Sequence, residues 1–233
     1  MTTDCLVGSS DHKKVFIKNL GFDNNLKPRM AMPVCKIGIF GNCRAGTSSI
    51  VRSFSREDEM QCQQYTCVTI EDSSRILVNY KNEQMVLEIF DIPFINEFHA
   101  IRDAYILDVR GIILVYDISN KQSFSSLKDL MELVTTVRMA KKNDQRVDNF
   151  RLAIVGNKCD LEAERAVTPQ EGKQFAATRN ALFFETSARM RINIDELFHE
   201  LGFEVFLLLQ EMATYNNTEK KKKKEKAKNC ILS

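Results

Sequence analysis

A continuous apolar run over residues 111–116 constrains the fold of this chain more than any other feature. Such a run is expected of a central strand that is covered on both faces, as in a parallel sheet. Other strand-like segments alternate with helix-like segments on either side of it. This alternation predicts an α/β fold with a largely parallel sheet and right-handed crossovers. The expected strands are residues 34–40, 75–80, 84–90, 111–116, 151–155 and 182–184, and the expected helices are residues 48–54, 123–139, 168–179 and 192–214.

The 233 residues fit one domain of ordinary size with tails, or two small domains. Residues 1–33 lack sustained periodicity, so we expect a flexible N-terminal extension, in which Val15-Phe16-Ile17 is a patch that could dock. Residues 34–214 carry the alternating pattern, and residues 215–233 form a polybasic tail. No run approaches the ~18 uncharged apolar residues of a membrane-spanning helix. The first residues also lack the pattern of a secretory signal.

The net charge of +2 is unevenly distributed. Residues 219–228 contain seven Lys and two Glu, a charge of +5, so the other residues sum to 2 − 5 = −3. A positive charge confined to one short tail argues against a groove for nucleic acid, and no nucleic-acid partner is expected.

The seven cysteines include no C-x-x-C pair, which argues against a disulfide scaffold or a structural zinc site and favours a reducing cytosol.

The segment from Gly41 to Ser48 follows the first expected strand and opens the first expected helix. Its layout is that of a phosphate loop, G-x-x-x-x-G-K-[S/T], except that Thr47 stands at the lysine position. In such a loop, backbone N–H groups and the helix N-terminus hold phosphate, and the serine hydroxyl binds Mg²⁺. Taken alone, these residues also fit an ordinary strand-to-helix turn. The candidate phosphate-binding residues are Gly41, Cys43, Arg44, Ala45, Gly46, Thr47 and Ser48.

A second motif, Asn157-Lys158-Cys159-Asp160, follows the strand that ends near Val155. The carboxyl ends of strands are where open α/β sheets bind ligands. Asp160 can accept hydrogen bonds from both the N1–H and the 2-amino group of guanine, a pair that adenine does not offer. Ser187 and Ala188 follow the next strand and supply a further base contact. The candidate guanine-binding residues are Asn157, Lys158, Asp160, Ser187 and Ala188.

With these motifs in this order, the chain resembles a Ras-type small GTPase from about residue 34 to residue 214, and its C-terminus matches too. The resemblance implies a P-loop NTPase-like fold with a six-stranded, mostly parallel sheet flanked by five helices. It also implies GTP or GDP with Mg²⁺ as ligands. The effector segment of the first switch would be Thr69, Ile70, Glu71, Asp72 and Ser73, and the Mg²⁺ set would be Ser48, Thr69 and, indirectly, Asp91. Effectors bound through the switch regions, an exchange factor and a GTPase-activating protein are the implied partners.

Two departures from the family's pattern fall in the phosphate loop. Thr47 replaces the phosphate lysine, and the loss of its charge-assisted hydrogen bond costs about 1.5–3 kcal/mol, roughly 10- to 150-fold in affinity. Cys43 and Arg44 occupy positions where the family has small residues. Side chains there crowd the γ-phosphate and the approach of an activator's arginine finger. Arg44 is also a candidate to substitute in part for the missing lysine.

Two further departures fall in the second switch. The family's D-x-x-G has become Asp91-Ile92-Pro93-Phe94, where Phe94 lacks the conformational range of glycine and Pro93 fixes its own φ. Ile95 stands where the family has the glutamine that orients the attacking water, and its side chain cannot hydrogen-bond to water. An arginine finger, together with correctly positioned catalytic groups, accelerates GTP hydrolysis by ~10³–10⁵. We therefore assign no catalytic residue and expect slow or impaired GTP hydrolysis.

The last four residues, Cys230-Ile231-Leu232-Ser233, form a C-a-a-X box for prenylation of Cys230, and a terminal serine favours farnesyl. One prenyl chain anchors weakly, and the lysines between Lys220 and Lys228 supply the second signal, at ~1 kcal/mol each near an anionic membrane surface. The expected location is the cytoplasmic face of the plasma membrane or of another cell membrane.

The main hypothesis is a membrane-anchored Ras-like GTP-binding protein in signal transduction, with impaired hydrolysis. The alternative is a pseudoGTPase, an interaction module that binds effectors or regulators without a functional nucleotide cycle, and Thr47 with Pro93 and Phe94 motivates it. An ATP-using phosphate-loop enzyme fits poorly because Asp160 selects guanine.

Overall fold

The computed structural model of the chain describes residues 15–16, 32–55, 72–92, 99–141 and 149–231. Within these ranges the strands form one sheet in the order β1-β3-β4-β2-β5-β6-β7, and every neighbouring pair is parallel except β3 and β4. The strands are β1 (Val15–Phe16), β2 (Val34–Gly41), β3 (Asp72–Tyr80), β4 (Glu83–Asp91), β5 (Gly111–Asp117), β6 (Arg151–Asn157) and β7 (Leu182–Thr186). The predicted six-stranded, mostly parallel sheet is confirmed, and β1 is an addition to it.

β1 comes from the segment that the sequence predicts to be a flexible extension. Its two residues pair in parallel with Arg75 and Ile76 of β3, at the edge of the sheet. The patch that the sequence left free to dock therefore contributes an edge strand. Residues 1–14 and 17–31 lie outside the described residues, so the flexibility of the extension stays a prediction.

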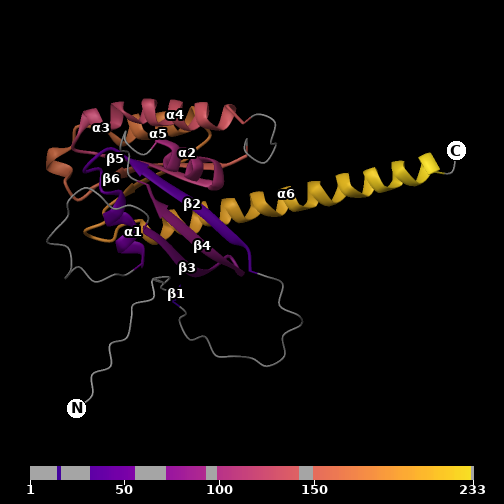
Figure 1. Cartoon of the computed structure of the whole chain (residues 1–233). Coiled ribbons are helices and arrows are strands. Elements are labelled where there is room, and N and C mark those ends of the chain that lie inside the picture. Colours follow the sequence, from indigo (N-terminus) through magenta and orange to yellow (C-terminus); the bar gives the residue numbers. More distant parts are fainter. Residues whose placement is uncertain (1–14, 17–31, 56–71, 93–98, 142–148, 232–233) are drawn as a thin grey trace, which may run out of the picture.

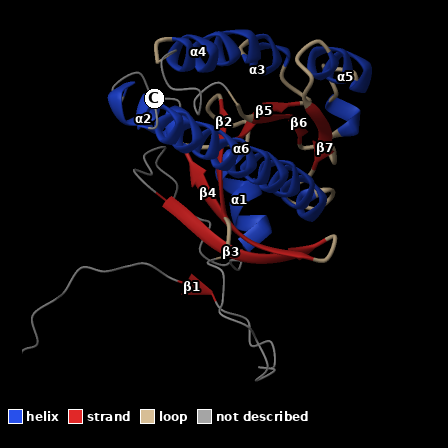
Figure 2. Cartoon of the chain, turned by 90° about the vertical axis from the view of Figure 1, so that its right-hand side faces the viewer, coloured by secondary structure: helices blue, strands red, loops and turns tan. Residues whose placement is uncertain are grey.

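Helices cover both faces of the sheet (Figure 1). They are α1 (Thr47–Ser55), α2 (His99–Asp108), α3 (Lys121–Ser125), α4 (Leu127–Met139), α5 (Pro169–Ala177) and α6 (Ile194–Ile231). Side chains of α1 and α6 pack on one face, and side chains of α2, α4 and α5 pack on the other. Figure 2 shows α1 and α6 on the opposite side of the sheet from α3, α4 and α5.

The apolar run that predicts a central strand is β5, and all seven of its residues are buried. Ile113 and Val115 belong to the core under α1 and α6, whereas Ile112 and Leu114 belong to the core on the opposite face. This alternation is the two-residue period of a strand with a helical layer on each side. The interpretation of the run as a doubly covered strand is confirmed.

Two predicted element boundaries need correction. The predicted helix over residues 123–139 is divided at Ser126 into α3 and α4, and α3 begins earlier because the Asn120 side chain caps it. The helix predicted over residues 192–214 continues to Ile231 as α6, so residues 215–231 of the predicted tail are helical. The reason is local: no Gly or Pro follows Gly202, and lysine, glutamate and alanine are good helix formers.

The carboxyl ends of β2, β4, β5, β6 and β7 lie along one edge of the sheet, because these strands run parallel to one another. Among the described residues, the candidate phosphate loop and the two candidate base-binding loops leave from this edge. At the other end of the chain, α6 projects away from the sheet (Figure 1). Among the described residues, no helix combines the length and the apolar character needed to cross a membrane.

Candidate functional site

The loop between β2 and α1 has the shape that the phosphate-loop interpretation requires. Its chain reverses at Arg44, which has a φ of 68°, and the Ala45 N–H donates to the Asn42 carbonyl oxygen at 3.0 Å. Gly46 has a φ of 93°, which glycine adopts without the strain of a side chain. The helix α1 then begins at Thr47, so the free N–H groups of its first turn face the end of the loop. Backbone N–H groups at a helix start attract anions.

Asn157 ties this loop to the loops that follow β6 and β7. Its Nδ2 donates to the Ala45 carbonyl oxygen at 2.9 Å, and its Oδ1 accepts from Thr186 Oγ1 at 3.2 Å and from the Ala188 N–H at 3.4 Å. The residue is 1% exposed. Gly46 must lack a side chain, because a Cβ there would collide with the Asn157 amide. The structure thus places Asn157 as a buried link between the two halves of the site.

Asp160 is held with its carboxylate open to solvent. Ser187 Oγ donates to Asp160 Oδ1 at 2.6 Å, and the same Oγ accepts the Met190 N–H at 3.0 Å. Ser187 is fully buried, whereas Asp160 is exposed. A carboxylate with a fixed position is suited to accept a pair of hydrogen bonds from one edge of a base. The structure therefore brings together Asp160 and Ser187, as the sequence predicts.

Lys158 contacts a residue that the sequence interpretation missed. Its Nζ lies 2.6 Å from Oδ2 of Asp117, the last residue of β5. Oδ1 of Asp117 accepts the Ser119 N–H at 2.9 Å and the Ser119 hydroxyl at 2.7 Å. Burial raises the pKa of Asp117, but the hydrogen bonds from Lys158 and Ser119 outweigh it and lower that pKa overall. The sequence did offer a signal for Asp117 as a site residue: it is an acidic residue directly after the apolar run over residues 111–116, at the carboxyl end of a parallel strand.

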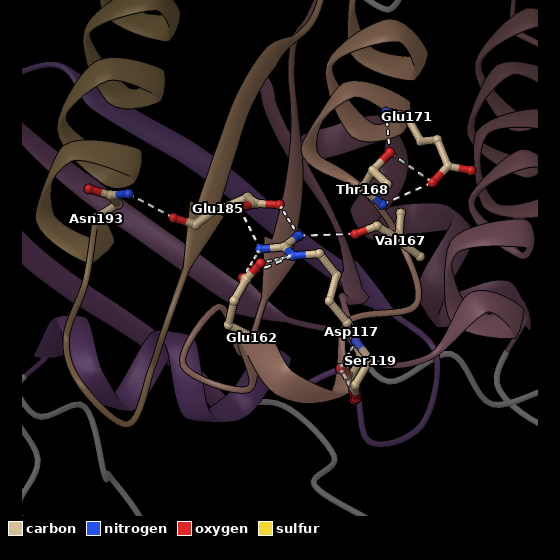
Figure 3. Close-up of polar contacts among 9 residues, drawn as sticks. Asp117, Ser119, Glu162, Val167, Thr168, Glu171, Glu185 and Asn193 are labelled. Carbon is tan, nitrogen blue, oxygen red and sulfur yellow. Dashed lines mark hydrogen bonds and ion pairs between the residues drawn. The ribbon is translucent and has the colours of Figure 1, made fainter.

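A set of polar contacts centred on the Arg165 side chain and Glu185 connects the segments that carry the base-binding loops (Figure 3). The Arg165 guanidinium donates to Glu185 Oε1 at 2.7 Å, to Glu162 Oε2 at 2.6 Å and to the Val167 carbonyl oxygen at 3.0 Å. The Asn193 amide donates to the Glu185 carbonyl oxygen at 2.7 Å. These bonds connect the loop after β6 to β7 and to the start of α6, so they fix the positions from which Asp160 and Ser187 project.

The remaining site residues divide into described and undescribed ones. Cys43 and Arg44 are exposed, Thr47 and Ser48 are half-buried in the first turn of α1, and Asp91 ends β4 opposite Ile39 of β2. Asp72 and Ser73 begin β3, and Cys230 lies near the end of α6. Thr69, Ile70, Glu71, Pro93, Phe94 and Ile95 lie outside the described residues.

These residues fit a guanine nucleotide at the base end better than at the phosphate end. The base end offers the fixed carboxylate of Asp160, and the phosphate end offers the backbone of the loop that Asn157 holds. Position 47 offers no cation, and the Thr47 methyl group lies 2.9 Å from where a Cβ on Gly41 would be. The oxygens of Ser48 and Asp91 are ligands that suit Mg²⁺. Bound there, Mg²⁺ would neutralise charge on the phosphates.

Comparison with known families decides what these loops are. A model described as the Ras family matches residues 36–206, from β2 into α6 and through every loop described above. The chain belongs to the Ras family. The resemblance inferred from the motifs and the α/β fold that it implies are confirmed. As a Ras-family chain this is a small GTP-binding protein. Members of the Ras family in general bind guanine nucleotide with Mg²⁺ and interact with effectors, exchange factors and GTPase-activating proteins.

Proposed function

We propose that this Ras-family protein is a signalling switch with slow or impaired GTP hydrolysis. The observation that carries the proposal is a pre-assembled base-binding end beside a phosphate loop without its lysine. Ser187 donates directly to Asp160, and Asn157 links the Ala45 carbonyl oxygen to Thr186 and Ala188. The Thr47 methyl group, in contrast, lies toward Gly41. Binding of guanine is thereby supported, while the charge that stabilises a transferring phosphoryl group is reduced.

The sequence of the second switch supports the same proposal. Ile95 stands at the position of the water-orienting glutamine, and Phe94 stands at the position of the glycine in D-x-x-G. Signals would pass through the effector segment over residues 69–73 and through the second-switch region up to Tyr105. Effector proteins of the Ras type are the proposed partners, with an exchange factor and a GTPase-activating protein as regulators.

Nucleotide released from the freshly purified protein by denaturation, and separated by chromatography, tests the proposal directly. Stoichiometric GTP is the expected result, followed by single-turnover hydrolysis far slower than that of an ordinary Ras-type enzyme. The matched control is the double variant Thr47→Lys with Ile95→Gln, in which hydrolysis should recover in part. A wild-type turnover equal to that of an ordinary Ras-type enzyme would contradict impaired hydrolysis.

The second candidate is a pseudoGTPase that binds effectors or regulators without a nucleotide cycle, and Thr47 favours it. Under this alternative the purified protein is folded and empty, and GDP or GTP with Mg²⁺ leaves its melting temperature unchanged. A rise in melting temperature with GDP but not with ADP would exclude it, because ligand binding to the folded state stabilises that state.

We further propose that the protein is anchored to the cytoplasmic face of the plasma membrane or of another cell membrane. The support is the C-a-a-X cysteine, Cys230, next to the lysines of residues 220–228. Farnesylated protein should sediment with vesicles that contain anionic lipid, and less with neutral vesicles. The control variant Cys230→Ser should stay in the supernatant. Equal sedimentation of the two proteins would contradict the proposal.

A further inference from the structure

Asp117 occupies a position in the site that the established family assignment does not explain. It ends β5 directly beside Asn157 of β6 in the sheet register. The base-binding loop begins one residue after Asn157, with Lys158 in the left-handed region at a φ of 65°. The Lys158 side chain crosses from this loop to β5, where its Nζ lies 2.6 Å from Asp117 Oδ2. The ion pair therefore bridges two neighbouring strand ends at the edge where α/β sheets bind ligands.

The carboxylate of Asp117 is itself fixed by its neighbours. Ser119 supplies both a backbone and a side-chain donor to Oδ1, which orients Oδ2 toward Lys158. The Asp117 N–H donates to Ser123 Oγ at 3.0 Å in the first turn of α3. Of the two charged side chains, that of Asp117 is 10% exposed and that of Lys158 is 32% exposed. A rigid, nearly buried anion thus holds a long cation that remains partly open to solvent.

We propose that Asp117 is a positioning residue for nucleotide binding, acting through Lys158. Its carboxylate holds the Lys158 side chain against the end of β5, so that the base-binding loop keeps its shape before nucleotide binds. This inference rests on the proposed function, because it assumes that the site binds nucleotide. Asp160 reads the base, whereas Asp117 supports the loop for any purine nucleotide. Loss of Asp117 should therefore shorten the residence time of GDP and of inosine diphosphate by the same factor.

The test uses the full-length protein loaded with fluorescent GDP and with fluorescent inosine diphosphate, and follows their release after excess unlabelled nucleotide is added. In Asp117→Asn both dissociation rates should rise roughly 10-fold, as for a lost hydrogen bond to a charged group. The ratio of the two rates should stay at the wild-type value, whereas Asp160→Asn should change it. The control Asp108→Asn makes the same chemical change in the exposed ion pair with Lys36, and its rates should stay at wild-type values.

A double-mutant cycle separates positioning from general destabilisation. If Asp117 acts through Lys158, then Asp117→Asn should have no further effect on release in a Lys158→Ala background. Additive effects in that cycle, or wild-type release from Asp117→Asn, would overturn the inference while leaving nucleotide binding intact. A wild-type protein that retains neither fluorescent nucleotide would overturn the proposed function as well, so the two failures are distinguishable.

Discussion

At the scale of the residue, position 47 shows how one side chain changes the chemistry of a phosphate loop. Thr47 Cγ2 lies 2.9 Å from where a Cβ on Gly41 would be, and Gly41 is also close to Ala45 and to the Val115 carbonyl oxygen. The loop is therefore packed around a threonine and keeps its turn without the lysine. Its backbone can still present N–H groups to phosphate, but the compensating charge is absent at this position.

Restoring the lysine should restore the charge. In Thr47→Lys we expect GDP and GTP to bind about 10- to 150-fold more tightly, the range of one charge-assisted hydrogen bond. The measurement is the dissociation constant from fluorescent nucleotide titration. The control Ser49→Lys adds the same charge at an exposed position of α1, outside the loop, and should change the affinity little. Equal gains in the two variants would show that net charge, and not the position, is responsible.

The pKa of Asp117 predicts a pH dependence of stability. Its folded-state pKa lies below the ordinary value of 3.8, so its contribution to stability is present above that value and is lost as the pH falls through the folded-state pKa. The free energy of unfolding of wild type minus that of Asp117→Asn should therefore be constant from pH 7 to about pH 5 and should shrink below pH 3.8. Urea unfolding at pH 7, 5 and 3 measures it. A difference that grows on acidification would contradict the assignment.

At the scale of the element, the sequence predicted whether a segment is a helix or a strand better than it predicted the residues at which that element begins and ends. The expected strands over residues 75–80 and 84–90 leave room for only a short turn, and Lys81 and Asn82 have positive φ values that suit a tight hairpin. The break at Ser126 was not predictable from periodicity, because α3 and α4 keep the same helical phase in the apolar pattern. The length of α6 was underestimated because residues 215–233 were interpreted as a polybasic tail, although no Gly or Pro among them stops a helix.

The start of α5 is an element boundary that its sequence does encode. The Thr168 hydroxyl accepts the Glu171 N–H at 3.3 Å, and Glu171 Oε2 accepts the Thr168 N–H at 2.9 Å, which together form a capping box. Thr168→Ala should destabilise the protein by about 1 kcal/mol in urea unfolding. Thr168→Ser keeps the hydroxyl and should retain most of that stability. A loss in Thr168→Ser as large as in Thr168→Ala would point to the methyl group instead.

At the scale of the whole molecule, the sequence predicted the framework and the residues at its edge, but not the contacts among them. Asn157 and Asp160 were both assigned to the base because they share one motif. In the structure Asn157 is buried and links loops, whereas Asp160 faces solvent. Asp117 and Arg165 were missed because their roles depend on partners 41 and 20 residues away in the chain, which only the fold brings together.

The two parts of α6 should differ in their effect on stability. Among the α6 residues whose side chains are described, the last buried one is Leu208, and Tyr215 and Thr218 are exposed. We expect a stop codon after Thr214 to leave the thermal midpoint within ~1 °C of wild type, since the truncation leaves Leu208 and the earlier buried residues of α6 in place and exposed positions such as Tyr215 contribute little to stability. The far-ultraviolet circular dichroism should lose the signal of the missing helical residues. A large drop in the midpoint would mean that residues 215–233 contact the domain.

The continuity of α6 has a mechanical consequence. From Leu208 to Cys230 the helix advances about 33 Å at 1.5 Å per residue. A flexible peptide of the same number of residues would let the domain rotate freely about its attachment point. A continuous helix acts as a lever arm, which fixes the orientation of the domain as well as its distance from that point. A lipid on Cys230 would then restrict how the sheet edge with the nucleotide loops is tilted toward a membrane, and a single kink in the arm would release that restriction.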